Sequence, residues 1–294
     1  MSNKIIITGG SGLLGQYLNI EAAKENEILT LHNKYIGNCK EFKSVMADVL
    51  NFNLMKELFS SFKPDVVFHT AAVTNPIPLP GQNPKDVYNI NVNATKNIAD
   101  LCKQFDSKLI YISTDLVYAG YRGSMLDESA KLIPVSLYAE TKLMAEMKVK
   151  ETLENYLILR SSLLYGFGLN HSRCHFHKMS EELKNDKPVK LFVDQFRTPI
   201  SLQEAAGMIT KIAQMDKANE TINLGGLERV SRYELGEILC SVAGYDKSLL
   251  EKISLNDIPE LPKVEDVSLN TDKLQSLGIK IKTIENSIVD ILNK

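Results

Sequence analysis

A tyrosine and a lysine stand four residues apart in the stretch YAETK, as Tyr138 and Lys142. On a helix, positions i and i+4 project from the same face, so this spacing predicts neighbouring side chains. An ammonium group beside a phenol favours the phenolate and lowers the tyrosine pKa from about 10 toward neutrality. We therefore expect Tyr138 to give or take a proton, with the Thr114 hydroxyl hydrogen-bonded to the same substrate oxygen.

A second chemical signal is the glycine-rich stretch TGGSGLLG, which lies between an apolar run and an apolar helical pattern. Glycines let a backbone approach a pyrophosphate closely, and a helix that starts there offers free N–H groups. The order strand, glycine turn, helix therefore predicts a dinucleotide site. Its glycines fit G-x-G-x-x-G starting at Gly10 and equally G-x-x-G-x-x-G starting at Gly9.

The choice of dinucleotide depends on the end of the second predicted strand, in LTLHNKYIG. NAD sites usually carry an acidic residue about 20 positions after the glycine loop, where it binds the adenosine ribose. Here no Asp or Glu lies between Glu27 and Glu41. His32, Asn33 and Lys34 are suited to a 2′-phosphate instead, which favours NADP, with NAD as the alternative.

These residues need a scaffold, and the first part of the chain alternates short apolar runs with longer segments of helical spacing. Strands are expected over Lys4–Thr8, Ile28–Leu31, Val45–Ala47, Asp65–His69, Lys108–Ser113 and Tyr156–Ser161. Helices are expected over Leu13–Lys24, Leu54–Phe62, Pro84–Phe105 and Leu137–Leu153. Such alternation implies a parallel sheet with helices on both faces. We predict an α/β protein: a Rossmann doubly wound sheet over residues 1–165, and a smaller C-terminal α/β substrate-binding lobe over residues 166–294. Elements around residues 193–225 are expected to pack back on the first domain.

Composition excludes several other classes of protein. Hydrophobic residues make up 44% of the chain, charged residues 24%, and the net charge is -2, which favours neither nucleic acid nor an anionic membrane as a partner. The apolar run at the N-terminus is too short for a signal peptide, so we expect a cytoplasmic protein. The four cysteines lack paired spacing and are interpreted as free thiols.

Two histidine signals are interpreted as structural. The stretch NHSRCHFH gathers His171, Cys174, His175 and His177, but structural zinc sites normally use two separated pairs of ligands. We therefore predict no metal site and expect a loop that lines the substrate cleft. His69 ends a buried strand and is expected to be a hydrogen-bonded core residue.

Seven stretches in order resemble the extended short-chain dehydrogenase/reductase family: TGGSGLLG, ADV, TAAVT, NVNATKN, STDLVY, YAETK and RSSLLYG. The resemblance implies that Gly9, Gly12 and Gly15 are the glycines in use. It implies a catalytic set of Thr114, Tyr138 and Lys142, in which Lys142 also binds the nicotinamide ribose. Besides these residues and Asn33 and Lys34, it implies dinucleotide contacts from Ser11, Leu13, Leu14, Asp48, Val49, Ala71, Ala72, Val73, Asn91, Ser113, Ser161, Ser162 and Leu163.

Within that family the chain is similar to the dTDP-4-dehydrorhamnose reductases and to the regulatory beta subunits of methionine adenosyltransferase. The similarity extends through the second lobe in DQFRTPISLQEAA and INLGGLERVSRYELGEIL. It implies an NADPH-dependent reduction of a nucleotide-linked 4-keto-6-deoxy sugar in polysaccharide biosynthesis. Substrate contacts are expected from Thr74, Asn75, Val117 and Arg197. Arg197 is preferred over Arg173, Lys178 and Arg232 for the diphosphate.

Alternatives stay open at this point. Leu116 stands where dehydratases and epimerases of the family carry an acid–base side chain, which disfavours both reactions. A dinucleotide-binding regulatory subunit without turnover remains an alternative. The prolines at 76, 78, 80 and 84 depart from the pattern of the rhamnose-type reductases, so the sugar is expected to differ. Homodimerisation is implied by the relatives alone.

Overall fold

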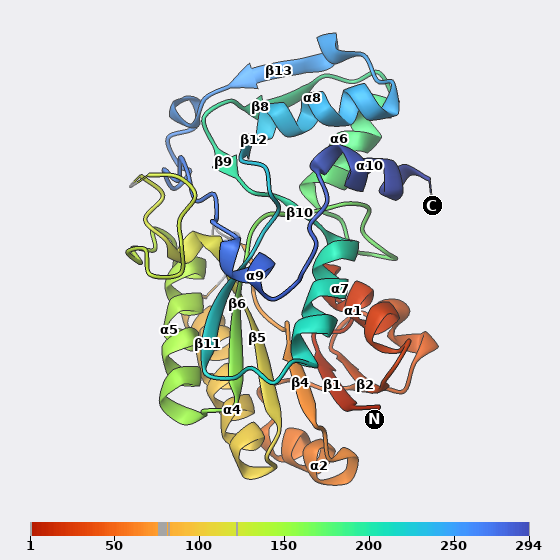
Figure 1. Cartoon of the computed structure of the whole chain (residues 1–294), viewed down its shortest axis with the longest axis vertical. Coiled ribbons are helices and arrows are strands. Elements are labelled where there is room, and N and C mark those ends of the chain that lie inside the picture. The colour runs from red at the N-terminus through yellow and green to blue at the C-terminus, as the bar shows by residue number, and fades with distance from the viewer. Residues whose placement is uncertain (1, 76–80, 82, 122, 294) are drawn as a thin grey trace.

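The computed structural model describes residues 2–75, 81, 83–121 and 123–293. A seven-stranded sheet with the strand order β11-β6-β5-β4-β1-β2-β3 forms its centre (Figure 1). Every neighbouring pair of strands in this sheet runs parallel. The strands are β1 Lys4–Thr8, β2 Glu27–His32, β3 Ser44–Met46, β4 Val66–His69, β5 Lys108–Thr114, β6 Tyr156–Ser161 and β11 Glu220–Leu224. The predicted doubly wound α/β class is confirmed.

Helices cover both faces of the sheet. α1 (Leu13–Ala22) and α7 (Leu202–Ala213) pack on one face, where they bury Ile5 and Ile7 of β1. α2 (Phe52–Phe62), α4 (Ala94–Gln104) and α5 (Leu137–Thr152) cover the other face, where Ile6 lies. Because neither face meets water, the strands are continuous apolar runs and do not alternate with polar residues. Each fully buried isoleucine stabilises the fold by about 1.5 to 3 kcal/mol.

The helix that carries Tyr138 and Lys142 has a fixed starting point. Ser136 is the N-cap of α5, and its side chain accepts a hydrogen bond from the Ala139 backbone N–H. Serine is favoured there because its side chain satisfies one of the otherwise unpaired N–H groups of the first turn. The cap places Tyr138 in the first turn and Lys142 in the second.

The helix predicted over Pro84–Phe105 contains an irregularity that the sequence did not reveal. α3 (Pro84–Tyr88) runs into a π-helical turn at Asn89–Asn93 and then into α4. In this turn the Asn91 side chain bonds both to the Val73 backbone N–H, at 2.8 Å, and to its carbonyl, at 3.0 Å. Asn91 therefore holds the loop after β4, and it lines neither of the two cavities described below.

The second lobe is the upper part of Figure 1 and is built around a separate apolar cluster that includes Phe176, Leu191, Leu239 and Ile288. Its helices are α6 (His175–Lys184), α8 (Arg232–Ala243) and α10 (Ile284–Leu292). Its parallel pair of strands is β8 (Val189–Phe192) with β13 (Leu250–Ile253). Four short strands form the pairs β7 (Leu164–Tyr165) with β10 (Ile200–Ser201) and β9 (Phe196–Arg197) with β12 (Val230–Ser231). The helix α9 (Asp272–Ser276) packs against β11, and its Leu274 belongs to the core of the central sheet.

One stretch, residues 167–175, connects the lobes across the start of α1; we refer to it as the crossing segment. Buried Gln16 of α1 donates to the Leu169 carbonyl and to the Ser172 hydroxyl, both at 3.0 Å. Its amide oxygen accepts from the Asn170 side chain at 2.7 Å. Ring centroids of His171 and Tyr35 lie 4.6 Å apart. The crossing segment is thus tied to the first domain over its whole middle part.

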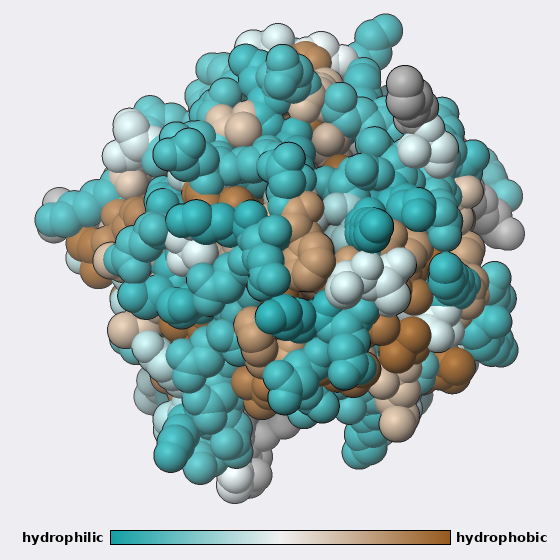
Figure 2. Space-filling model, turned by 90° about the horizontal axis from the view of Figure 1, so that it is seen from below, coloured by the Kyte–Doolittle hydropathy of each residue, from teal (hydrophilic) through white to brown (hydrophobic). Residues whose placement is uncertain are grey.

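The face of the molecule seen from below is mainly polar, with separate hydrophobic areas (Figure 2). Among the described residues, every helix is too short or too polar to cross a membrane.

Candidate active site

Two adjoining cavities open where the parallel strands end. The larger, of about 580 Å³, lies at the carboxyl ends of β1, β4, β5 and β6, and the smaller, of about 280 Å³, at those of β1 to β4. Gly12, Thr70 and Ala72 line both cavities. This edge of a doubly wound sheet is where ligands bind in such folds, because the loops diverge there.

Steric limits explain the glycines between the two cavities. Gly9 has a φ of +67°, and a Cβ there would lie 2.7 Å from the Ala71 backbone nitrogen. A Cβ at Gly15 would lie 2.1 Å from the Gly9 carbonyl oxygen. Gly12 is the N-cap of α1 and provides no side-chain cap, so the first N–H groups of this helix remain available to an anion. These residues fit the pyrophosphate of a dinucleotide.

The predicted residues divide between the cavities. The larger is lined by the predicted Gly12, Leu13, Leu14, Gly15, Ala72, Thr74, Ser113, Thr114, Tyr138, Lys142, Ser161, Ser162 and Leu163. The smaller is lined by the predicted Gly9, Ser11, Gly12, Asn33, Lys34, Asp48, Val49, Ala71, Ala72 and Val73. This division matches a dinucleotide whose nicotinamide end faces Tyr138 and whose adenosine end faces Lys34.

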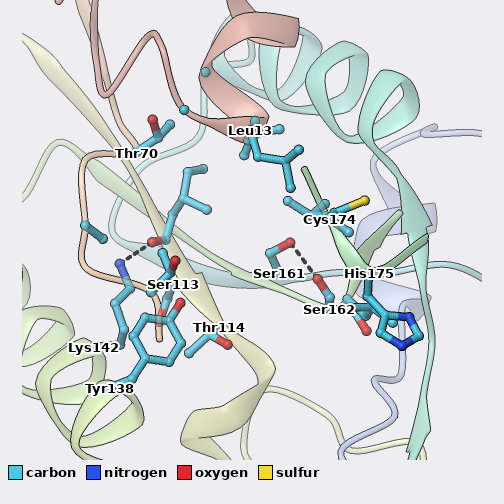
Figure 3. A pocket seen from close by; sticks show the side chains of 18 residues that line it. Leu13, Thr70, Ser113, Thr114, Tyr138, Lys142, Ser161, Ser162, Cys174 and His175 are labelled. Atoms are coloured by element: carbon cyan, nitrogen blue, oxygen red, sulfur yellow. Dashed lines mark hydrogen bonds between the residues drawn. The ribbon is translucent and has the colours of Figure 1, made fainter. Parts of the chain in front are cut away.

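Thr114 and Tyr138 lie side by side on one wall of the larger cavity (Figure 3). Burial raises the pKa of Tyr138 to about 12, a hydrogen bond with the Thr114 side chain lowers it, and the charge of Asp115 raises it. The expectation that Lys142 lowers this pKa is wrong for the protein without a ligand. The helical spacing is as predicted, but the desolvation of the phenolate dominates.

Lys142 extends toward β5. Its Nζ donates to the Ile112 carbonyl at 2.6 Å and lies 4.1 Å from the centroid of the Tyr111 ring (Figure 3). Burial lowers the pKa of Lys142 to about 7, and the charge of Glu146 partly opposes this shift. The side chain therefore changes charge near neutral pH.

The neighbouring hydroxyl, Ser113, is already engaged. Its Oγ donates to the Glu146 carboxylate at 2.6 Å, which also pairs with Arg160 through two nitrogens, at 3.1 Å and 2.8 Å. Glu146 and Arg160 are almost completely buried. Because the Ser113 hydroxyl has one hydrogen and donates it to Glu146, the Thr114 hydroxyl is better placed to bind a substrate.

The residues predicted to bind substrate lie in different places. Thr74 lines the larger cavity, whereas exposed Asn75 lines neither cavity. Val117 is fully buried in an apolar cluster and does not reach a cavity, which corrects the expectation that it contacts substrate. Arg197 is buried with its Nε 3.3 Å from Asp115 Oδ2, so the diphosphate role assigned to it stays a prediction.

The other cations considered for the diphosphate are placed as follows. Arg173 and Lys178 are exposed, and Arg232 donates from its Nε to the Gln195 side chain at 3.0 Å. Pro76, Pro78 and Pro80 lie outside the described residues, whereas Pro84 occupies the first turn of α3.

The histidine-rich stretch is part of the crossing segment and the start of α6. Cys174 and His175 line the larger cavity, and His177 Nδ1 accepts from the Gly168 N–H at 2.9 Å. α6 begins at His175, inside this stretch. His69 contacts the Thr8 hydroxyl at 2.7 Å and the Thr95 hydroxyl at 3.0 Å, as expected of a core histidine.

Three residues that line the larger cavity were not predicted: Thr70, Ile112 and Leu164. Thr70 and Leu164 lie inside stretches that carry the family resemblance, so position alone could have found them. Cys174 and His175 belong to the histidine-rich stretch that was expected to line the substrate cleft, and both line this cavity.

Known proteins resemble the whole chain. The model of the RmlD substrate binding domain family matches residues 3–294. Methionine adenosyltransferase 2 subunit beta of Xenopus laevis is 26% identical over 96% of this chain and 84% of its own length. dTDP-4-dehydrorhamnose reductase of Aggregatibacter actinomycetemcomitans is 24% identical over 87% of this chain and 82% of its own. The crystal structure of dTDP-4-dehydrorhamnose reductase from Bacillus anthracis in complex with NADP has a TM-score of 0.88 and 23% identity, covering 100% of this chain and 99% of that one.

Proposed function

Because the chain belongs to the RmlD substrate binding domain family, we propose that it is an NADPH-dependent reductase of a nucleotide-linked 4-keto-6-deoxy sugar in polysaccharide biosynthesis, with Tyr138 as the proton donor. One observation carries the proposal. Thr114, Tyr138 and Lys142 line the same cavity as the glycine loop, where a nicotinamide would lie. The relatives named as reductases and the NADP in a neighbouring structure support the same reaction class.

Bound NADPH would supply a hydride to the carbonyl carbon of the sugar. Tyr138 then gives its phenolic proton to the carbonyl oxygen as negative charge develops there. Its raised pKa keeps the proton on the phenol until that oxygen becomes basic. Thr114 orients the same oxygen through a hydrogen bond. Lys142, held at the Ile112 carbonyl, is placed to bind ribose hydroxyls.

NADP is proposed over NAD on the residues of the smaller cavity. Asn33 and Lys34 line it with no acidic residue beside them on the loop after β2. Lys34 Nζ lies 5.3 Å from the Tyr35 ring centroid, which keeps the ammonium at the cavity wall. Asp48 and Val49 line the same cavity from the loop after β3, where an adenine would lie.

Dehydration and epimerisation need an acid–base side chain two residues after Thr114, where this chain has Leu116. Leu116, two residues after Thr114, packs against the apolar cluster that contains Tyr118 and Leu269. An aliphatic side chain carries no proton to transfer, so dehydration and epimerisation are not supported there.

A regulatory role without turnover is the second candidate, because beta subunits of methionine adenosyltransferase 2 are among the relatives. The discriminating experiment mixes the purified protein with NADPH and a panel of nucleotide-linked 4-keto sugars and follows loss of the reduced nicotinamide. Turnover is expected, and Tyr138→Phe should lower kcat by about 10² to 10⁴ while NADPH binding is retained.

Tyr245→Phe is the matched control, because this tyrosine contacts Ser180 in the second lobe, outside both cavities. It should leave kcat unchanged. Absence of turnover on every ketone, together with co-purification of another enzyme, would instead support the regulatory role.

The predicted homodimer is part of this proposal. Met144 and Met147 of α5 are 45% and 53% exposed, as expected of side chains that a second copy covers. Sedimentation velocity on the wild type and on Met147→Glu tests it, and a monomeric wild type would refute it. The cytoplasmic location stays a prediction.

A further inference from the structure

A buried carboxyl group lies directly behind the Thr114 hydroxyl. Asp115 is 4% exposed, and its Oδ1 is 3.2 Å from Thr114 Oγ1. Its Oδ2 lies 3.3 Å from Ser162 Oγ and 3.3 Å from Arg197 Nε. Asp115 does not line the larger cavity, whereas Thr114 does. Through this hydroxyl, the carboxyl group acts on the cavity without touching its contents.

The hydroxyl of Thr114 has a single hydrogen and two lone pairs. One lone pair accepts from the Leu116 N–H at 3.3 Å. If Asp115 is a carboxylate, it accepts a hydrogen bond from the Thr114 hydroxyl, which then presents only a lone pair to the cavity. If Asp115 is protonated, it donates to Thr114, and the Thr114 hydrogen is free to point into the cavity.

We propose that Asp115 is a positioning residue that sets the direction of the Thr114 hydrogen bond, and that its neutral form lets Thr114 donate to the carbonyl oxygen of the substrate. This inference rests on the proposed function, because a carbonyl oxygen can only accept. No covalent bond changes at Asp115, and its proton stays on the carboxyl group throughout. Tyr138 remains the group that transfers a proton.

The surroundings of Asp115 act on its charge in opposite directions. Burial raises its pKa above 3.8, whereas Arg197 from β9, Arg232 from α8 and the hydroxyls of Thr114 and Ser162 lower it. Arg197 has the largest effect among the partners that lower the pKa. Removing the Arg197 charge should therefore extend the neutral form of Asp115 to higher pH.

The kinetic test compares kcat against pH for wild type, Asp115→Asn and Arg197→Met. An asparagine amide donates to Thr114 at every pH, so Asp115→Asn should lack the fall in kcat that wild type shows as Asp115 ionises. In Arg197→Met the midpoint of this fall should move to higher pH. Asp246→Asn, at an exposed turn of the second lobe, is the control and should follow the wild-type curve. An unchanged midpoint in Asp115→Asn would overturn the inference.

A second measurement needs no turnover and no stable variant of Arg197. Infrared difference titration of the wild type should show a protonated carboxyl band that is absent in Asp115→Asn and shifted in Thr114→Val, since valine cannot accept its hydrogen bond. A protonated carboxyl band at the same frequency in Thr114→Val and in the wild type would overturn the inference, whatever the activity of the enzyme. If the wild type reduces no ketone but shows the band, and the band shifts in Thr114→Val, the proposed function is refuted and the hydrogen bond between Asp115 and Thr114 is not.

Discussion

The buried pair of Glu146 and Arg160 gives the sharpest stability prediction. The two side chains are 1% and 2% exposed and share two hydrogen bonds, and Arg160 also donates to the Tyr118 hydroxyl at 2.9 Å. Glu146→Leu leaves the Arg160 cation buried without its counterion. We expect a loss of about 3 to 5 kcal/mol in the free energy of unfolding, because the desolvation of Arg160 is no longer offset.

That loss is a large part of the free energy of unfolding of a typical folded protein, which is about 5 to 15 kcal/mol. With a urea slope of about 2 kcal/mol per M, the midpoint should fall by about 2 M. Unfolding is followed by far-UV circular dichroism, because the chain contains no tryptophan. The double variant Glu146→Leu/Arg160→Leu should recover most of the loss, since it buries no charge.

Asp100→Leu is the control for removing a carboxylate from an ion pair. Asp100 pairs with Lys96 at 2.7 Å on the exposed side of α4, and such pairs contribute about 0 to 1 kcal/mol. Equal losses in Glu146→Leu and in the double variant would refute the reasoning, because the cost would then come from packing and not from the uncompensated charge.

Three further predictions concern the cofactor site and the core. Lys34→Ala should weaken NADPH binding by about 1.5 to 3 kcal/mol and leave NADH binding unchanged in fluorescence titrations; equal affinity of the wild type for both would count against a 2′-phosphate site. Burial lowers the pKa of His69 from 6.5 to about 3, so the folded state should lose stability as pH falls through this window, because the unfolded chain takes up the proton first. Urea unfolding at several pH values should show that the free energy of unfolding falls less with decreasing pH in His69→Gln than in the wild type. Gly15→Ala, whose Cβ would lie 2.1 Å from the Gly9 carbonyl oxygen, should abolish NADPH binding. Gly207→Ala within α7 is the control and should bind NADPH normally, because its Cβ would lie 4.0 Å from the nearest atom, Glu21 Oε1.

The sequence predicted six of the seven strands of the sheet, because most of these are buried apolar runs, whereas β11 was not predicted. Runs such as that of β1 are apolar at every central position, and turns with glycine or polar residues separate them. The glycine loop and the spacing of Tyr138 and Lys142 were equally accessible, since both follow from local geometry. Residues 84–105 show the limit, because a π-helical turn and a straight helix share the same apolar spacing.

The sequence could not predict how deeply side chains are buried or which residues pair across long distances in the chain. The spacing of Tyr138 and Lys142 indicates that they are neighbours but not how strongly burial opposes a phenolate, so the direction of the Tyr138 pKa shift was wrong. Arg197 looks like a free cation in DQFRTP, yet the fold places it against Asp115, from a distant part of the chain. Only the three-dimensional structure reveals that pair.

The crossing segment has a consequence for how the site can be altered. His171 stacks on Tyr35 beside the smaller cavity, and Cys174 and His175 form part of the wall of the larger one. Consecutive residues of the crossing segment thus border both cavities. In the proposed reductase these cavities would hold the sugar and the dinucleotide, so a substitution here that admits a bulkier sugar should also change dinucleotide binding, and the two specificities would not evolve independently.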